Sequence, residues 1–118
     1  MKKIKWIAEK IEEELHDAEE YARAAHHYKE ADQELSRCCA SLAEEELKHS
    51  DKLHREAVRA IQEHKDAGRE SPAAMQAVWD WEHDKMIDHT ARIRHMLALL
   101  NRLRIIYGYL RVTNKTEF

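Results

Sequence analysis

Apolar residues recur every three or four positions along three long stretches of this chain, and this spacing constrains the fold more than any other feature. Such a period is typical of an amphipathic α-helix. The chain has two glycines and one proline, so few positions interrupt the helical pattern. Its 118 residues are enough for one domain with its own hydrophobic core. The sequence therefore predicts an all-α fold in a single domain.

Three helices are expected, and we predict that they cover residues 3–29, 33–66 and 72–107. Asp32 can cap the second helix, because its side chain can accept a hydrogen bond from the first turn. Gly68 suits the position just after that helix, and Ser71 with Pro72 suits the start of the third. Gly108 and the polar tail after it are expected to end the fold. The short connections predict an antiparallel three-helix unit.

Each helix carries one stripe of residues spaced by three and four. The first stripe contains Ile4, Ile7, Ile11, Glu14, Ala18, Tyr21, Ala25 and Tyr28. The second contains Leu35, Cys39, Leu42, Glu46, His49, Leu53, Ala57, Ala60 and His64. The third contains Met75, Val78 or Trp79, Glu82, Met86, His89, Ile93, Met96, Leu100, Leu103 and Tyr107. We expect these stripes to form the core, and expect most of the remaining histidines at the surface: His26, His27, His54, His83 and His95.

Five acidic or histidine residues interrupt these otherwise apolar stripes: Glu14, Glu46, His49, Glu82 and His89. A buried ionised group costs several kcal/mol unless it is paired or bound to a metal. With a rise of about 1.5 Å per residue, Glu14, Glu46 and His49 lie within about one turn of the same height. His89 falls at the level of His49, whereas Glu82 lies roughly 10 Å lower. The sequence therefore predicts that four or five of these side chains meet.

Carboxylate oxygen and imidazole nitrogen together favour a transition metal, with iron, manganese and zinc as the candidates. Glu46 and His49 are one turn apart on one helix face, so both can reach the same ion. No thiolate is expected at this level of the chain. These residue types therefore predict a metal site in the helical bundle.

Two motifs resemble the ferritin-like di-iron carboxylate proteins, which include ferritins, bacterioferritins, rubrerythrins and encapsulated ferritins. Glu14 followed seven residues later by Tyr21 is similar to the family's first helix, and Glu46-x-x-His49 is similar to its second. The resemblance covers roughly the first 65 residues. It implies that Glu14 and His49 are metal ligands, that Glu46 bridges two ions, and that Tyr21 packs beside the centre. It also implies oxidation of ferrous iron by oxygen or peroxide, with any storage requiring a cage or a partner compartment shell.

The chain departs from the family by carrying half of its ligand set. The full set is a Glu from each of two helices and a Glu-x-x-His from each of two others. A two-fold dimer could supply the second half, as in encapsulated ferritins. Alternatively, the third helix could close the site with His89, with or without Glu82. In both cases we expect a homodimer or a higher homo-oligomer.

Other functional classes receive little support from the composition. The net charge of −3 and the interleaved acids and bases argue against nucleic-acid binding. The longest apolar run, Met96 to Leu100, is too short to cross a membrane. The adjacent Cys38 and Cys39 suggest reduced thiols in a cytoplasmic protein. There is no Ser-His-Asp order or glycine-rich phosphate loop.

Two alternatives to the di-metal protein stay open. The first is a metal-free helical assembly protein in which the Glu and His residues form buried polar layers that specify register. The second is a mononuclear zinc or manganese enzyme. Metal content per chain separates these possibilities.

Overall fold

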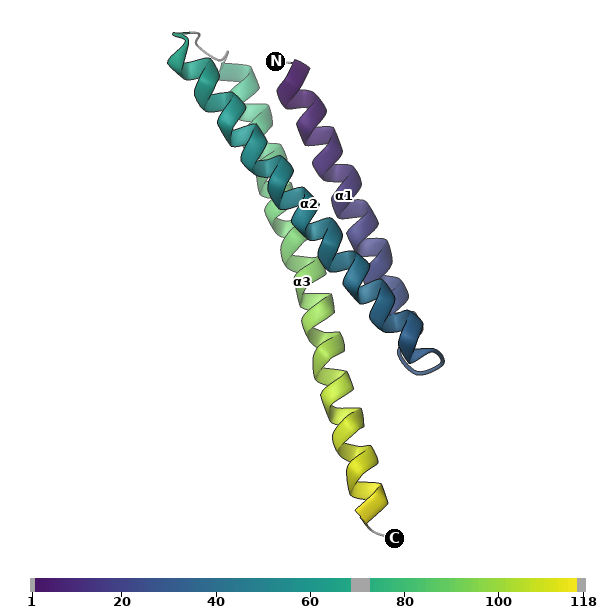
Figure 1. The fold of residues 1–118 in the computed structure, drawn as a ribbon. Coiled ribbons are helices and arrows are strands. Elements are labelled where there is room, and N and C mark those ends of the chain that lie inside the picture. The colour runs from purple at the N-terminus through teal and green to yellow at the C-terminus, as the bar shows by residue number, and fades with distance from the viewer. Residues whose placement is uncertain (1, 69–72, 117–118) are drawn as a thin grey trace.

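Three long helices form the chain, as the sequence predicts (Figure 1). The computed structural model describes residues 2–68 and 73–116, with side chains for 2–68, 73 and 76–106. The helices are α1 (Lys2–His27), α2 (Gln33–Asp66) and α3 (Ala73–Thr116). α1 and α3 run in the same direction and α2 runs against both, in a rod measuring 74 × 19 × 18 Å. The all-α, three-helix fold is therefore confirmed.

The ends of the helices agree with the sequence at some positions and differ at others. Asp32 caps α2, because its Oδ1 accepts a hydrogen bond of 3.0 Å from the Leu35 amide. Gly68 follows α2 with a φ of 72°, a left-handed conformation that glycine adopts without strain. The expected start at Ser71 and Pro72 lies outside the described residues. The expected end near 107 is wrong, since α3 continues through Gly108; one glycine inside a helix costs only about 1 kcal/mol.

Small residues let α1 and α2 pack closely along their length. Ala18, Ala22 and Ala43 are fully buried between the helices. Larger apolar residues from all three helices complete the core, namely Ile7, Ile11, Leu15, Leu47, Met86, Ile93 and Leu97. The α1–α2 hairpin is therefore the most tightly packed part of the molecule.

Part of the predicted stripe of α1 and α2 is buried, but at other turns the buried residue is the one that follows the predicted position. In α1, Leu15 and Ala22 are buried, whereas Glu14 is only half-buried. In α2, Leu47 and Ser50 are buried in place of the predicted Glu46 and His49. The reason is that each helix faces two neighbours, so the centre of its buried face points between them. The stripe members Ile7, Ile11, Ala18, Ala25, Cys39, Ala57 and Ala60 are buried as predicted, whereas Glu14, Glu46 and His49 lie at the outer edge of the α1–α2 contact.

α1 and α3 lie side by side in parallel register. Glu19 meets His89, and His26 meets Met96 at the next level down; both pairs are 70 residues apart. The His26 Nε2 atom is 2.7 Å from the Met96 carbonyl oxygen. This constant offset means that side chains seven residues apart on α1 meet side chains seven residues apart on α3.

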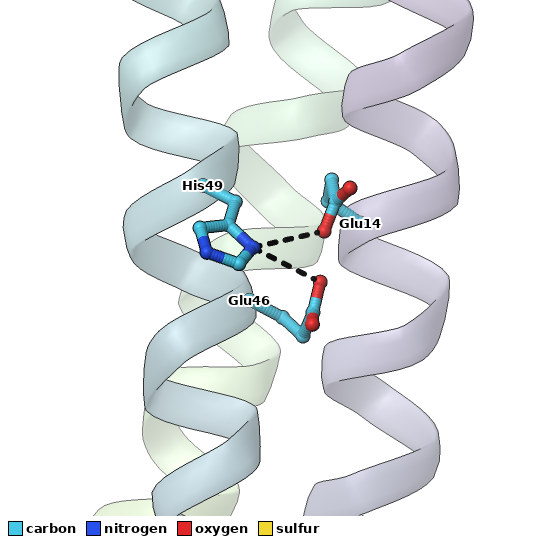
Figure 2. Close-up of side chains that lie close together, drawn as sticks. All are labelled: Glu14, Glu46 and His49. Atoms are coloured by element: carbon cyan, nitrogen blue, oxygen red, sulfur yellow. Dashed lines mark ion pairs between the residues drawn. The ribbon is translucent and has the colours of Figure 1, made fainter.

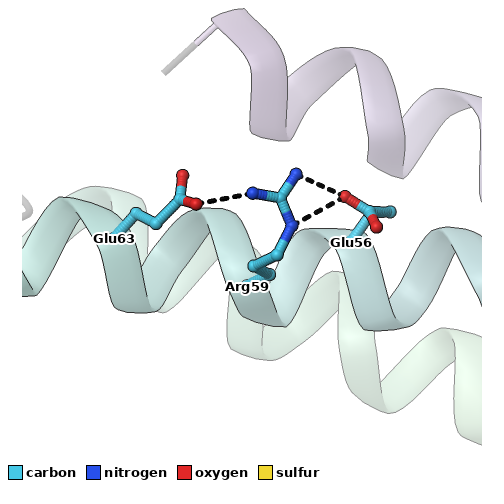
Figure 3. Close-up of polar contacts among 3 residues, drawn as sticks. All are labelled: Glu56, Arg59 and Glu63. Atoms are coloured by element: carbon cyan, nitrogen blue, oxygen red, sulfur yellow. Dashed lines mark hydrogen bonds and ion pairs between the residues drawn. The ribbon is translucent and has the colours of Figure 1, made fainter.

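The solvent face of α2 is held by ion pairs within the helix. Arg59 bridges Glu56 and Glu63, one on each side of it along the helix (Figure 3). Such pairs at three and four residues support a helix that has a long exposed face. Among the residues that the structure describes, no helix has a stretch apolar enough to cross a membrane.

Candidate metal centre

Three of the five predicted site residues meet across the α1–α2 groove. Glu14 comes from α1, and Glu46 and His49 come from successive turns of α2 (Figure 2). The Nδ1 atom of His49 is 3.5 Å from Glu14 Oε2 and 3.6 Å from Glu46 Oε2. One ligand atom from each residue lies within 4.8 Å of the other two. The shared level predicted from helix rise is therefore correct for these three residues.

The cluster lies on the outer side of the α1–α2 pair. In Figure 2 the three side chains stand in front of these helices, with α3 passing behind. The side chains of Glu14 and Glu46 are 26% and 19% exposed, but that of His49 is 53% exposed. The prediction that His49 is a core residue is therefore wrong. The carboxylates are half-buried between the helices, and the imidazole is the most exposed of the three groups.

The local packing explains why these side chains converge. Ala18 follows Glu14 by one turn on α1, and Ala43 precedes Glu46 by nearly one turn on α2; both alanines are fully buried. Their small size brings the two backbones close, so that side chains at the edge of the contact point across the groove rather than past each other. The site is thus built on the best-packed pair of helices in the molecule.

The donor set fits a transition metal ion. Two carboxylates that face each other repel when both are ionised, and a cation between them removes that repulsion. His49 directs a ring nitrogen toward both carboxylates, and a neutral imidazole is a good ligand for iron, manganese or zinc. Three protein donors also leave further coordination positions for water or for a second set of protein ligands.

Tyr21, which the resemblance places beside the centre, lies two turns from Glu14 on α1. Its ring is half-buried and packs against the main apolar cluster. Its role beside a metal stays a prediction.

Glu82 and His89 lie elsewhere, along the groove between α1 and α3. Lys85 Nζ is 3.7 Å from Glu82 Oε1, and Glu19 Oε1 is 3.7 Å from His89 Nε2. Burial lowers the pKa of His89, and the neighbouring Glu19 acts in the opposite direction. The groove has a volume of about 1230 Å³ and is lined mainly by charged side chains. The structure does not bring Glu82 or His89 to the other three residues, and we leave both out of the ligand set.

A second acidic pair, which the sequence analysis missed, joins α1 to α3. Glu12 lies beside Glu82, and its pKa is raised by a hydrogen bond with that carboxyl group, then by burial and by the charge of Glu82. Glu82 Oε2 is buried and has no hydrogen-bond partner among the residues that the structure describes. No sequence pattern indicated this pair, because the 70-residue offset that it shares with the two pairs below it is known only from the structure.

Three histidines expected at the surface are half-buried instead. His26 bonds the α3 backbone, and His54 and His83 stack between α2 and α3. His27 and His95 are exposed, as predicted. Cys38 is exposed and Cys39 is buried, and both thiols are free, also as predicted.

Comparison with known proteins adds no relative. No family model matches the chain, and neither a curated protein nor a solved structure matches it. The resemblance to ferritin-like proteins therefore rests on the motif residues and on their arrangement.

Proposed function

We propose that this chain is a ferritin-like metal-binding protein whose ligands are Glu14, Glu46 and His49. The observation that carries the proposal is the convergence of three ligand atoms within 4.8 Å from residues that are distant in sequence. The half-buried carboxylates and the imidazole favour iron, with manganese or zinc as competitors. As part of the same proposal, the protein acts in the cytoplasm, where its free thiols stay reduced.

A second copy of the chain completes the centre in this proposal. One copy supplies one Glu from α1 and one Glu-x-x-His from α2, which is half of the family's ligand set. The site opens outward, and α3 lies on the opposite side of the hairpin, so α3 does not block an approaching partner. Tyr28 and Leu35, at the turn end of the α1–α2 hairpin, are exposed apolar side chains. A two-fold axis through this face would place two half-sets opposite each other and cover those side chains.

The protein's own contribution is binding and orientation. Glu46 is the less exposed carboxylate; in this proposal it would take the bridging role that the resemblance implies, and Glu14 and His49 would be the other ligands. Bound iron would supply the one-electron chemistry with oxygen or peroxide that the resemblance implies. A second copy packed over the groove would exclude bulk water from the two carboxylates.

A metal-free assembly protein is the second candidate, and one observation favours it. Large apolar side chains are exposed on all three helices, among them Trp6, Val58, Trp81 and Ile105. Such groups favour association with another chain, whether or not a metal is present.

Aerobic loading with ferrous iron tests the first proposal. The wild-type protein should bind iron stoichiometrically, and the Glu14→Ala, Glu46→Ala double variant should not. Glu45→Ala is the matched control, because Glu45 is an exposed neighbour outside the cluster. Unchanged iron binding in the double variant would remove the assignment.

A further inference from the structure

Three aromatic rings stack between α2 and α3. The rings of His54 and His83 lie with centroids 4.9 Å apart and planes 20° from parallel. Trp79, one turn before His83, lies beside both imidazoles with its ring nearly parallel to them, its centroid 6.0 Å from that of His83 and 6.3 Å from that of His54. His54 thus reaches from α2 onto two rings of α3. The stack links the two helices at the edge of the core.

The stack lies beside an opening in the α2–α3 contact. A cavity of about 320 Å³ is bordered by His54 and His83, and core side chains also line it: Ile11, Leu47 and Met86. Ser50 and Thr90 contribute small polar side chains to its walls. Separation of the two histidines would therefore widen a path from solvent to the core.

The charges around the stack do little to stabilise extra positive charge on it. Asp51 raises the proton affinity of His54, but its carboxylate is bonded to Arg55 at 2.7 Å. On α3, Arg94 lines the same cavity and is itself cationic. From α1, the lining residue is the apolar Ile11.

We propose that His54 and His83 form an acid-sensitive clasp, closed while both rings are neutral and opened when both are protonated. Two neutral imidazoles stack on each other and on the indole of Trp79 with favourable contact. Two imidazolium rings at the same separation repel each other in a half-buried site. Acid therefore weakens the α2–α3 contact at this point.

The direction of the effect agrees with the surroundings of His54. Burial lowers the pKa of His54, and the charge of His83 lowers it further, while Asp51 acts in the opposite direction. An opened or unfolded state therefore binds a proton to His54 more tightly than the closed state does. The closed contact keeps its full stability above about pH 6.5 and loses stability as the pH falls below that value.

Contacts elsewhere confine the opening to this place. The fully buried alanines of α1 and α2 pack the hairpin together through contacts that do not depend on pH. Farther along, Ser36 Oγ accepts a hydrogen bond of 3.1 Å from Arg104 and so ties α2 to α3 near the other end. Opening of the clasp therefore loosens the N-terminal part of α3 and leaves the rest of the fold in place.

Trp79 reports the opening directly. Trp6 and Trp81 are exposed, so replacing both by Phe leaves Trp79 as the single indole in an otherwise intact chain. Between about pH 8 and pH 5 we expect its emission to shift to longer wavelength and acrylamide to quench it more strongly. Far-ultraviolet circular dichroism should stay constant over the same range.

Further substitutions in the chain that keeps only Trp79 show which histidines cause its pH response. Adding His54→Gln and His83→Gln should abolish the pH response of Trp79, because glutamine does not titrate. Adding His95→Gln, an exposed histidine on the same helix, should leave the response intact. The clasp is overturned by a response that persists without both histidines, by no response in the parent, or by a loss of helix that accompanies it. If the double variant does not fold, NMR titration of the parent decides: His54 must take up its proton as Trp79 changes.

Discussion

Glu14 and His49 are 35 residues apart in sequence, yet the Glu14 Oε2 and His49 Nδ1 atoms lie 3.5 Å apart across the α1–α2 groove. Glu46 joins them from the same helix as His49. The contact links two edges of the hairpin that carry mostly polar or half-buried side chains. A purely structural pair would gain little at so exposed a position. The proposed role as a ligand set for a cation would account for this arrangement.

Glu14→Gln should stabilise the metal-free protein slightly while abolishing its stabilisation by metal. The substitution removes the repulsion between two facing carboxylates, which we expect to add about 0.5 kcal/mol at about pH 8. Ligand binding to the native state stabilises it by RT ln(1 + [L]/Kd), and the variant should lose that increment. Urea unfolding with chelator and with manganese measures both effects. A variant that is less stable with chelator and equally stabilised by manganese would contradict the account.

His49→Ala should lower the affinity for metal while leaving the stability of the metal-free protein nearly unchanged. His49 is largely exposed, so we expect the free energy of unfolding without metal to change by no more than about 0.5 kcal/mol. Metal affinity should fall at least about tenfold, because one of three protein ligands is lost. Calorimetric titration measures the affinity, and His95→Ala serves as the control. Equal affinity in the two variants would exclude His49 from the site.

Glu12→Gln should stabilise the fold at neutral pH. The pKa of Glu12 is raised in the folded protein, chiefly by its hydrogen bond with Glu82. Its contribution to stability is therefore present in acid and is lost as the pH rises through the folded value. Glutamine keeps a donor toward Glu82 at every pH, so the gain, about 0.5 kcal/mol, should appear near pH 7 and vanish near pH 4. Thermal unfolding at both pH values measures it, with Glu45→Gln as control; a gain of equal size at both would refute the pairing.

Ser36→Ala should destabilise the protein although the substitution is small. Ser36 is buried, and its hydroxyl donates to the Ala25 carbonyl at 2.6 Å while accepting from Arg104. Loss of the hydroxyl leaves those partners unsatisfied, at a cost of about 1–2 kcal/mol in the free energy of unfolding. Ser41→Ala, at an exposed position of the same helix, should be nearly neutral. Equal stability of the two variants would mean that Ser36 does not join the helices.

The sequence was sufficient to predict the helices and the level at which Glu14, Glu46 and His49 meet. Apolar periodicity identifies helices, and a short turn at Asp32 fixes the relative heights of α1 and α2. It was not sufficient to predict which of two neighbouring residues at the margin of each stripe is buried. Glu46 and Leu47 are neighbours, and the choice between them depends on where the third helix packs.

The sequence analysis misplaced Glu82 and His89 for a related reason. Residue number along each helix predicts the level of a side chain along the bundle. It does not predict which neighbouring helix that side chain faces. Both residues lie on the face of α3 that meets α1 in parallel register, and the Glu19–His89 pair shows it. The helix heights counted through both turns put His89 level with Glu14, whereas the structure puts it beside Glu19.

Native mass spectrometry of the iron-loaded protein can show whether two copies share one metal centre, because it counts chains and metal ions in one particle. The account predicts an even number of chains and, at saturation, two ions for every two copies, with the metal lost in Glu46→Gln. Dimers that carry no metal after loading, or metal retained by Glu46→Gln, would contradict a shared centre at Glu14, Glu46 and His49.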